Sequence, residues 1–214
     1  MLIFIYRLFL TVIYRRKSIL QYLSEVNILK TFDAIFVTPR GFEHEVAGEI
    51  ITFVSHGEKF CGHSAIRFPD IDGVPKMIEA VTAGVGFSPY DKYDGEPCMT
   101  VLTIEVTDEQ YSAMVEEAKR IDAGDYSYGW KECAAGGIAD NLGETIGEAV
   151  SFILHCEGNS MDCSEVYTRI IRKACVRFLD GYDANAVTPE RAFKNTLIQS
   201  VAGNLKVVKV SYPE

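Results

Sequence analysis

Two short extended runs joined by a turn-rich segment limit the fold of this chain more than any other feature. The runs are His63–Phe68 and Met77–Val81, and Pro69–Pro75 lies between them. Proline, aspartate and glycine in that segment are typical of tight turns, whereas the flanking runs have strand composition. The sequence therefore predicts an antiparallel hairpin, in a register that places His63 opposite Val81.

Capping signals mark where helices follow the strands. Thr107 and Gln110 have the spacing of a capping box, and Asp162 and the Thr188–Pro189 pair are further helix starts. We expect helices over 18–32, 107–121, 162–179 and from 188 onward, with additional strands over 48–54, 99–106 and 205–210. Strands and helices in this order predict an α+β domain.

Charge divides the chain into two unlike parts. Residues 1–30 hold five basic residues and one acidic residue, a net charge of +4, whereas the remaining 16 basic and 29 acidic residues give −13. An acidic domain disfavours nucleic acid as a partner, because phosphate binding depends on Lys and Arg. We expect residues 1–33 to form a helical extension and residues 34–214 to form the folded domain.

The extension begins with an apolar run, Met1–Tyr14, that is too short to span a bilayer. It is also a poor secretory signal, since its basic cluster follows the apolar run and no cleavage site is evident. Three interpretations stay open: a helix docked on a partner or on the protein itself, an anchor at a membrane surface, or an upstream addition to a shorter domain. Residues 1–17 are the expected contact with a protein partner or membrane surface, and a cytoplasmic or assembly-associated location is favoured.

The six cysteines contain no CxxC pair, and the four histidines form no HExxH or Cys/His cluster. Scattered cysteines in a chain of this size are typical of reduced, buried thiols. We expect no structural zinc, no other metal and no cofactor.

Cys163 is the strongest candidate for a reactive residue. It follows Asp162, and Glu165 stands three residues after that aspartate, so the spacing places Cys163 at the first position of a helix. Free backbone N–H groups and the helix dipole stabilise a thiolate at that position, and they can also bind an oxyanion. A small buried thiol without chemical function is the alternative that spacing alone leaves open.

A thiolate nucleophile needs a base, normally a histidine that a polar group orients. The hairpin register makes His63 and Glu79 diagonal neighbours on one face of the sheet, within reach of long side chains. His44 and His155 lack such a partner, as does His56, which is the fallback base. The sequence thus favours His63, with Glu79 as its partner.

Four motifs occur in the order Gly48-Glu49-Ile50-Ile51, Gly62-His63-Ser64-Ala65-Ile66, Ile78-Glu79-Ala80 and Cys163-Ser164-Glu165-Val166. In this order they resemble the YiiX-like group of circularly permuted, NlpC-type papain-fold cysteine hydrolases. The resemblance covers roughly residues 46–195. It implies a permuted papain-like fold, in which an antiparallel sheet packs against a helix carrying the nucleophile at its N-terminus.

The resemblance also implies the roles of the site residues: Cys163 as nucleophile, His63 as general base and acid, and Glu79 as the group that orients the ring. It implies a thiol hydrolase of the peptidase or amidase type, which cleaves a small peptide or cell-wall-type amide through an acyl-enzyme intermediate. The residues expected to line the substrate pocket are Tyr126, Tyr128 and Ser164.

The chain departs from the family pattern at Glu49, which replaces an aspartate, at Asp162, and in a long Gly-rich segment over 134–160. A carboxylate at position 162 opposes ionisation of the neighbouring thiol unless it is turned away as the helix cap. Two alternatives therefore stay open. One is an acyltransferase or lipid-ester hydrolase of the same fold; the other is a non-catalytic structural or interaction module of a larger assembly, such as a virion.

Overall fold

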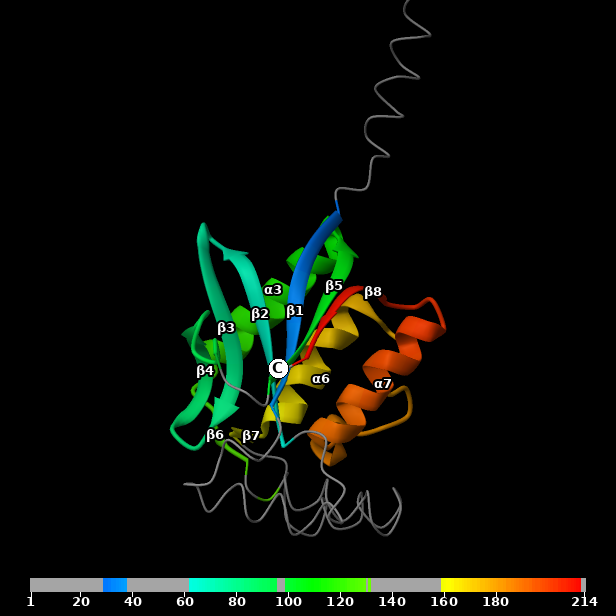
Figure 1. Ribbon diagram of the computed structural model, residues 1–214. Helices are drawn as coiled ribbons and strands as arrows, with labels where there is room; N and C mark the ends of the chain where they lie inside the picture. The colour runs from blue at the N-terminus through cyan, green and yellow to red at the C-terminus, as the bar shows by residue number, and fades with distance from the viewer. Residues whose placement is uncertain (1–28, 38–61, 96–98, 130, 132–158, 213–214) are drawn as a thin grey trace, which may run out of the picture.

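The computed structural model describes residues 29–37, 62–95, 99–129, 131 and 159–212, and shows an α+β fold (Figure 1). Its main sheet has six strands, all antiparallel to their neighbours, in the order β4-β3-β2-β1-β5-β8. These strands are β1 (Leu29–Val37), β2 (His63–Ile71), β3 (Val74–Val81), β4 (Gly84–Pro89), β5 (Met99–Thr107) and β8 (Lys206–Ser211). Two short parallel strands, β6 (Ser127–Tyr128) and β7 (Ser160–Met161), lie near one end of the sheet.

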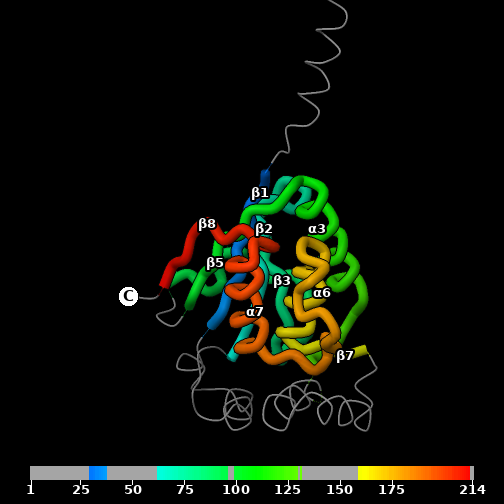
Figure 2. The backbone as a smooth tube through the Cα atoms, turned by 90° about the vertical axis from the view of Figure 1, so that its right-hand side faces the viewer, coloured from blue at the N-terminus to red at the C-terminus, as the bar shows by residue number. Residues whose placement is uncertain are grey.

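Three α-helices of the described part cover one face of this sheet. They are α3 (Asp108–Asp122), α6 (Cys163–Ala174) and α7 (Pro189–Val201), and a 3-10 turn, η2 (Ala184–Ala186), precedes α7. Figure 2 shows α6 between the other two helices. The main hydrophobic core lies between this layer and the sheet, and a smaller cluster occupies the opposite sheet face. The sheet is therefore covered mainly on one side, where α6 packs against β2 and β3.

The hairpin of β2 and β3 has the predicted register from Phe68 toward His63, after a one-residue shift between Phe68 and Ile71. Ile66 lies opposite Ile78, and Arg67 lies opposite Met77. Asp72 and Gly73 make the turn with φ angles of 54° and 81°, and an Asp-Gly pair suits a two-residue hairpin turn of this kind. The hairpin thus places His63 and Glu79 as expected.

The capping signals also begin helices as predicted. The Thr107 side chain accepts from the Gln110 N–H, and the Gln110 side chain accepts from the Thr107 N–H, which completes the capping box of α3. The Thr188 hydroxyl caps α7 by accepting from Arg191 N. These caps satisfy backbone donors that a helix start would otherwise leave without partners.

The expected helix over 18–32 is wrong for residues 29–32, which begin β1. This strand pairs with both β2 and β5, so its backbone hydrogen bonds are satisfied on both sides. Its buried side chains alternate between the two sheet faces: Phe32, Ala34 and Phe36 on the helix side, and Ile35 and Val37 on the other. Tertiary pairing overrides the helical spacing that ends near Leu29. The sheet therefore begins inside the stretch 1–33 that the sequence assigned to the extension.

The helix that begins at Cys163 ends at Ala174, before the expected end at Leu179. Cys175 has an extended backbone, with φ −136° and ψ 95°. The Arg172 side chain then donates to the carbonyls of Phe178 and Leu179, at 3.1 and 2.8 Å, and holds the chain in a turn. Phe178 is still fully buried, which is why its apolar spacing resembled a continuing helix.

Several other expectations lie outside the described residues. They are the proposed contact of residues 1–17 with a partner or membrane surface, the rest of the predicted helix over 18–28, the strand over 48–54, and almost all of the Gly-rich segment 134–160.

Candidate active site

The start of α6 holds Cys163 at its first helical position. Asp162 is the N-cap, and its Oδ1 accepts from Glu165 N at 2.7 Å. Cys163 is 1% exposed and belongs to the main core cluster. The N-terminal N–H groups of a helix have no carbonyl partner within the helix, so this end can stabilise negative charge on sulfur or oxygen.

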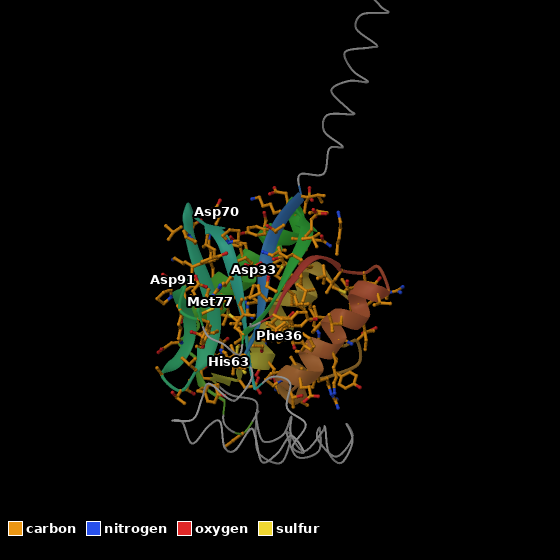
Figure 3. All side chains as sticks on the ribbon, viewed as in Figure 1. Asp33, Phe36, His63, Asp70, Met77 and Asp91 are labelled. Carbon is orange, nitrogen blue, oxygen red and sulfur yellow. The ribbon has the colours of Figure 1, made fainter. Side chains whose placement is uncertain are left out.

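His63 and Glu79 meet across the β2–β3 hairpin. The ring Nε2 lies 3.0 Å from Glu79 Oε2, and both side chains are buried. In Figure 3 His63 lies toward the end of the sheet where α6 begins, while Asp70 marks the far end of the hairpin. The diagonal pairing predicted from the strand register is therefore present as a direct contact.

The Cys163 side chain lies close enough to the His63 ring to influence its pKa. Glu79 contacts this ring at its Nε2 atom. Burial lowers the pKa of His63, but the charge and hydrogen bond of Cys163, followed by those of Glu79, outweigh burial and raise it to about 9. The structure thus brings the three predicted site residues together in the series Glu79–His63–Cys163. The raised pKa of His63 favours the protonated ring.

Two residues that the sequence analysis missed complete the surroundings of Glu79. Lys92 Nζ donates to Oε1 at 2.6 Å, and the Tyr93 hydroxyl donates to Oε2 at 2.7 Å. Burial raises the pKa of Glu79, but hydrogen bonding and charge from His63, then the hydrogen bonds of Lys92 and Ser88, hold it well below its usual range. The carboxylate is therefore ionised and fixed by several donors.

Lys92 and Tyr93 follow β4, a strand that the sequence analysis did not predict. β4 runs back along β3, with Gly86 opposite Glu79, so the residues after Pro89 return toward the carboxylate. The glycines of β4 gave no clear strand pattern. Without that strand, the sequence could not place Lys92 beside the site.

Asp162 is engaged within the first turn of α6. Besides capping Glu165 N, its Oδ1 lies 2.8 Å from the Ser164 hydroxyl. That hydroxyl also lies 2.6 Å from the carbonyl oxygen of Val187, and Ser164 is 1% exposed. The contacts of Ser164 therefore tie α6 to the segment before α7, and lining of the substrate pocket by this residue stays a prediction.

The capping role of Asp162 can be tested through the stability of the fold. Replacing Asp162 by alanine is expected to lower the free energy of unfolding by about 1–2 kcal/mol, because Glu165 N loses its acceptor. Asp162→Asn keeps a capping oxygen and should stay within about 0.5 kcal/mol of the wild-type chain. Urea unfolding measures both values, and equal stability of the alanine and asparagine variants would contradict the capping role.

Tyr126 and Tyr128, the other predicted pocket residues, lie near this end of the fold. Tyr128 in β6 pairs with Met161 in β7, two residues before Cys163. The Tyr126 carbonyl accepts from Val85 N at 3.2 Å, and its ring lies so close to Gly124 that a Cβ there would clash with it. Both rings pack against the main core, so a contact with substrate stays a prediction.

The remaining histidines, His44, His56 and His155, lie outside the described residues. Within the described part, no group of three or more His, Cys, Asp or Glu side chains could hold a metal ion. Across the same residues, no helix is long and apolar enough to cross a membrane. Cys163 and Cys175, the cysteines that the structure describes, are not in disulfides.

Comparisons of the chain with protein-family models, curated proteins and solved structures found no match.

Proposed function

We propose that this protein is a cysteine hydrolase of the peptidase or amidase type, with a permuted papain-like fold of the NlpC kind. The observation that carries the proposal is the chain of contacts from Glu79 through His63 to Cys163 at the start of α6. Nucleophile, base and orienting group in hydrogen-bonded series are what thiol catalysis requires, whatever their order in the sequence. The antiparallel sheet with α6 packed against it is compatible with that fold in general terms.

In the first step, the Cys163 thiolate attacks an amide carbonyl and forms the carbon–sulfur bond. The carbonyl oxygen takes the negative charge, which free N–H groups at the start of α6 are suited to bind. The His63 imidazolium then gives a ring proton to the leaving nitrogen as the carbon–nitrogen bond breaks. The products of this step are a free amine and an acyl-enzyme thioester, with His63 neutral.

In the second step, neutral His63 takes a proton from water, and the resulting hydroxide attacks the thioester carbonyl. The carbon–sulfur bond breaks, and the sulfur leaves as a thiolate beside the reprotonated ring. Glu79 keeps Nε2 as the hydrogen-bonded nitrogen. A small peptide or cell-wall-type amide is the proposed substrate class, on the basis of the motif resemblance.

Selective alkylation of Cys163 tests the proposal. Iodoacetamide at about pH 6 should modify Cys163 well before the other five cysteines, because the thiolate is the reacting form. Cys175 is the matched internal control: it is also buried and in a helix-terminal position, but burial raises the pKa of its thiol. Peptide mass spectrometry after a short exposure gives the extent of labelling at each cysteine.

A Cys175→Ser variant should keep the labelling of Cys163, and Cys163→Ser should remove the fast phase. Equal labelling of all accessible cysteines, or none at Cys163, would contradict the enzymatic proposal. That result would favour the alternative of a non-catalytic module.

A further inference from the structure

Lys92 gives Glu79 a second positive partner besides His63. Its Nζ lies 2.6 Å from Oε1, on the oxygen that the His63 ring does not contact, while Oε2 accepts from both His63 and Tyr93. Glu79 itself is 1% exposed, so these side chains take the place of water around the carboxylate. The ring of Tyr93 also packs beside the imidazole, with 5.7 Å between ring centres.

Lys92 and Tyr93 belong to a turn, residues 90–95, that we call the strap. Asp94 in the strap forms an ion pair at 2.8 Å with Arg67 of β2. The Tyr90 hydroxyl lies 3.5 Å from Asp33 of β1, and Arg67 lies opposite Asp33 in the strand pairing. The strap is therefore fixed to two strands of the sheet as well as to Glu79.

The proposed reaction explains why Glu79 needs Lys92 as a second positively charged partner. When His63 donates its proton, it becomes neutral, and Glu79 would be a buried anion without a charged partner. Burial favours the protonated form of such a carboxyl group. A protonated Glu79 could donate a hydrogen bond to the ring and would no longer hold Nε2 as a donor. Lys92 stays charged through the cycle and compensates Glu79 in that state.

We propose that Lys92 and Tyr93 are positioning residues, which keep the Glu79 carboxylate ionised and turned toward His63 while the ring gives up and regains its proton. The inference rests on the proposed function, because it is catalysis that makes His63 change its charge. Besides Lys92 and Tyr93 in the strap, the groups facing Glu79 are His63 of β2 and the Ser88 hydroxyl of β4, with Cys163 of α6 beyond the ring.

The test imitates the neutral ring in the full chain with His63→Gln, an uncharged side chain that can still donate a hydrogen bond. Carbon NMR of the carboxyl groups follows the ionisation of Glu79 from about pH 3 to about pH 9, its signal being the one lost in Glu79→Gln. With Lys92 present, the carboxylate should stay ionised to below about pH 5. Adding Lys92→Met should move the midpoint up by about 1–3 pH units, and Tyr93→Phe should move it less.

Lys92→Arg in the same background should restore the low midpoint, because it restores the charge. Lys119→Met is the matched control: Lys119 is 34% exposed against 35% for Lys92, and it forms an ion pair at 2.8 Å with Asp72, at the other end of the hairpin. It should leave the Glu79 midpoint unchanged. If the Lys92→Met variant does not fold, the variant that combines His63→Gln with Tyr93→Phe is used instead. A Glu79 midpoint in that variant equal to the midpoint in His63→Gln alone overturns the proposal.

The outcomes separate this inference from the proposed function. An unchanged Glu79 midpoint in Lys92→Met overturns the positioning role, even where Cys163 of the wild-type chain is selectively alkylated. Absence of selective alkylation overturns the proposed function, whatever the midpoint.

Discussion

Replacing His63 by alanine is expected to slow alkylation of Cys163 by iodoacetamide about tenfold or more at about pH 6. The ring contacts Cys163, and its raised pKa keeps it protonated there, so it stabilises the thiolate beside it. An ordinary cysteine thiol, with a pKa near 8.5, is ionised in only about one molecule in 300 at that pH. The higher intrinsic nucleophilicity of a more basic thiolate offsets part of this loss.

The pH profile separates this effect from a general disturbance of the fold. In the alanine variant, the alkylation rate should rise about tenfold per pH unit below the pKa of an ordinary thiol. In the wild-type chain it should change little over the same range, and the two rates should converge above about pH 9, where His63 loses its proton. Parallel profiles for the two proteins would be evidence against a thiolate–imidazolium pair.

The site geometry was largely accessible from the sequence because local signals determine it. The cap at Asp162 fixes Cys163 as the first residue of α6, and the Asp72–Gly73 pair fixes the position of the hairpin turn. The pairs beyond Phe68 are shifted by one residue relative to the Ile71–Val74 pair beside the turn, and this shift puts His63 and Glu79 on one face. Each of these inferences depended on a few neighbouring residues.

The parts that the sequence did not reveal depend on tertiary pairing. β1 forms where β2 and β5 provide partners on both sides, and nothing within Leu29–Phe32 announces those partners. β4 contains two glycines and is identified by its pairing with β3. Lys92 lies beside Glu79 because β4 runs antiparallel to β3 and returns the chain toward that residue. The contact could not be predicted without that strand.

Glu79→Gln is expected to lower the free energy of unfolding by about 3 kcal/mol near neutral pH. The substitution keeps the volume but leaves Lys92 and the protonated His63 facing each other without the anion between them. Removing one partner of a buried ion pair costs far more than removing an exposed one. Glu117→Gln is a control, because the two cations that pair with Glu117, Arg120 and Lys173, are 52% and 44% exposed. We expect that variant to lose about 1 kcal/mol or less in urea unfolding.

Wild type and Glu79→Gln differ in their free energy of unfolding, and the pH dependence of this difference identifies the charges responsible. Glu79 has a lowered pKa in the folded state, so its contribution is present above the unfolded value of 4.5 and is lost as the pH falls through the lower folded value. His63 has a raised pKa, so its contribution is complete below the unfolded value of 6.5 and is lost as the pH rises to about 9. The contributions of Glu79 and His63 are both present between pH 4.5 and pH 6.5, so the difference in stability should be largest in that range. It should decrease toward pH 9, where Lys92 is the remaining cation at Glu79. A difference that stays constant from about pH 4 to about pH 9 would mean that the packing of Glu79, and not its charge, stabilises the fold.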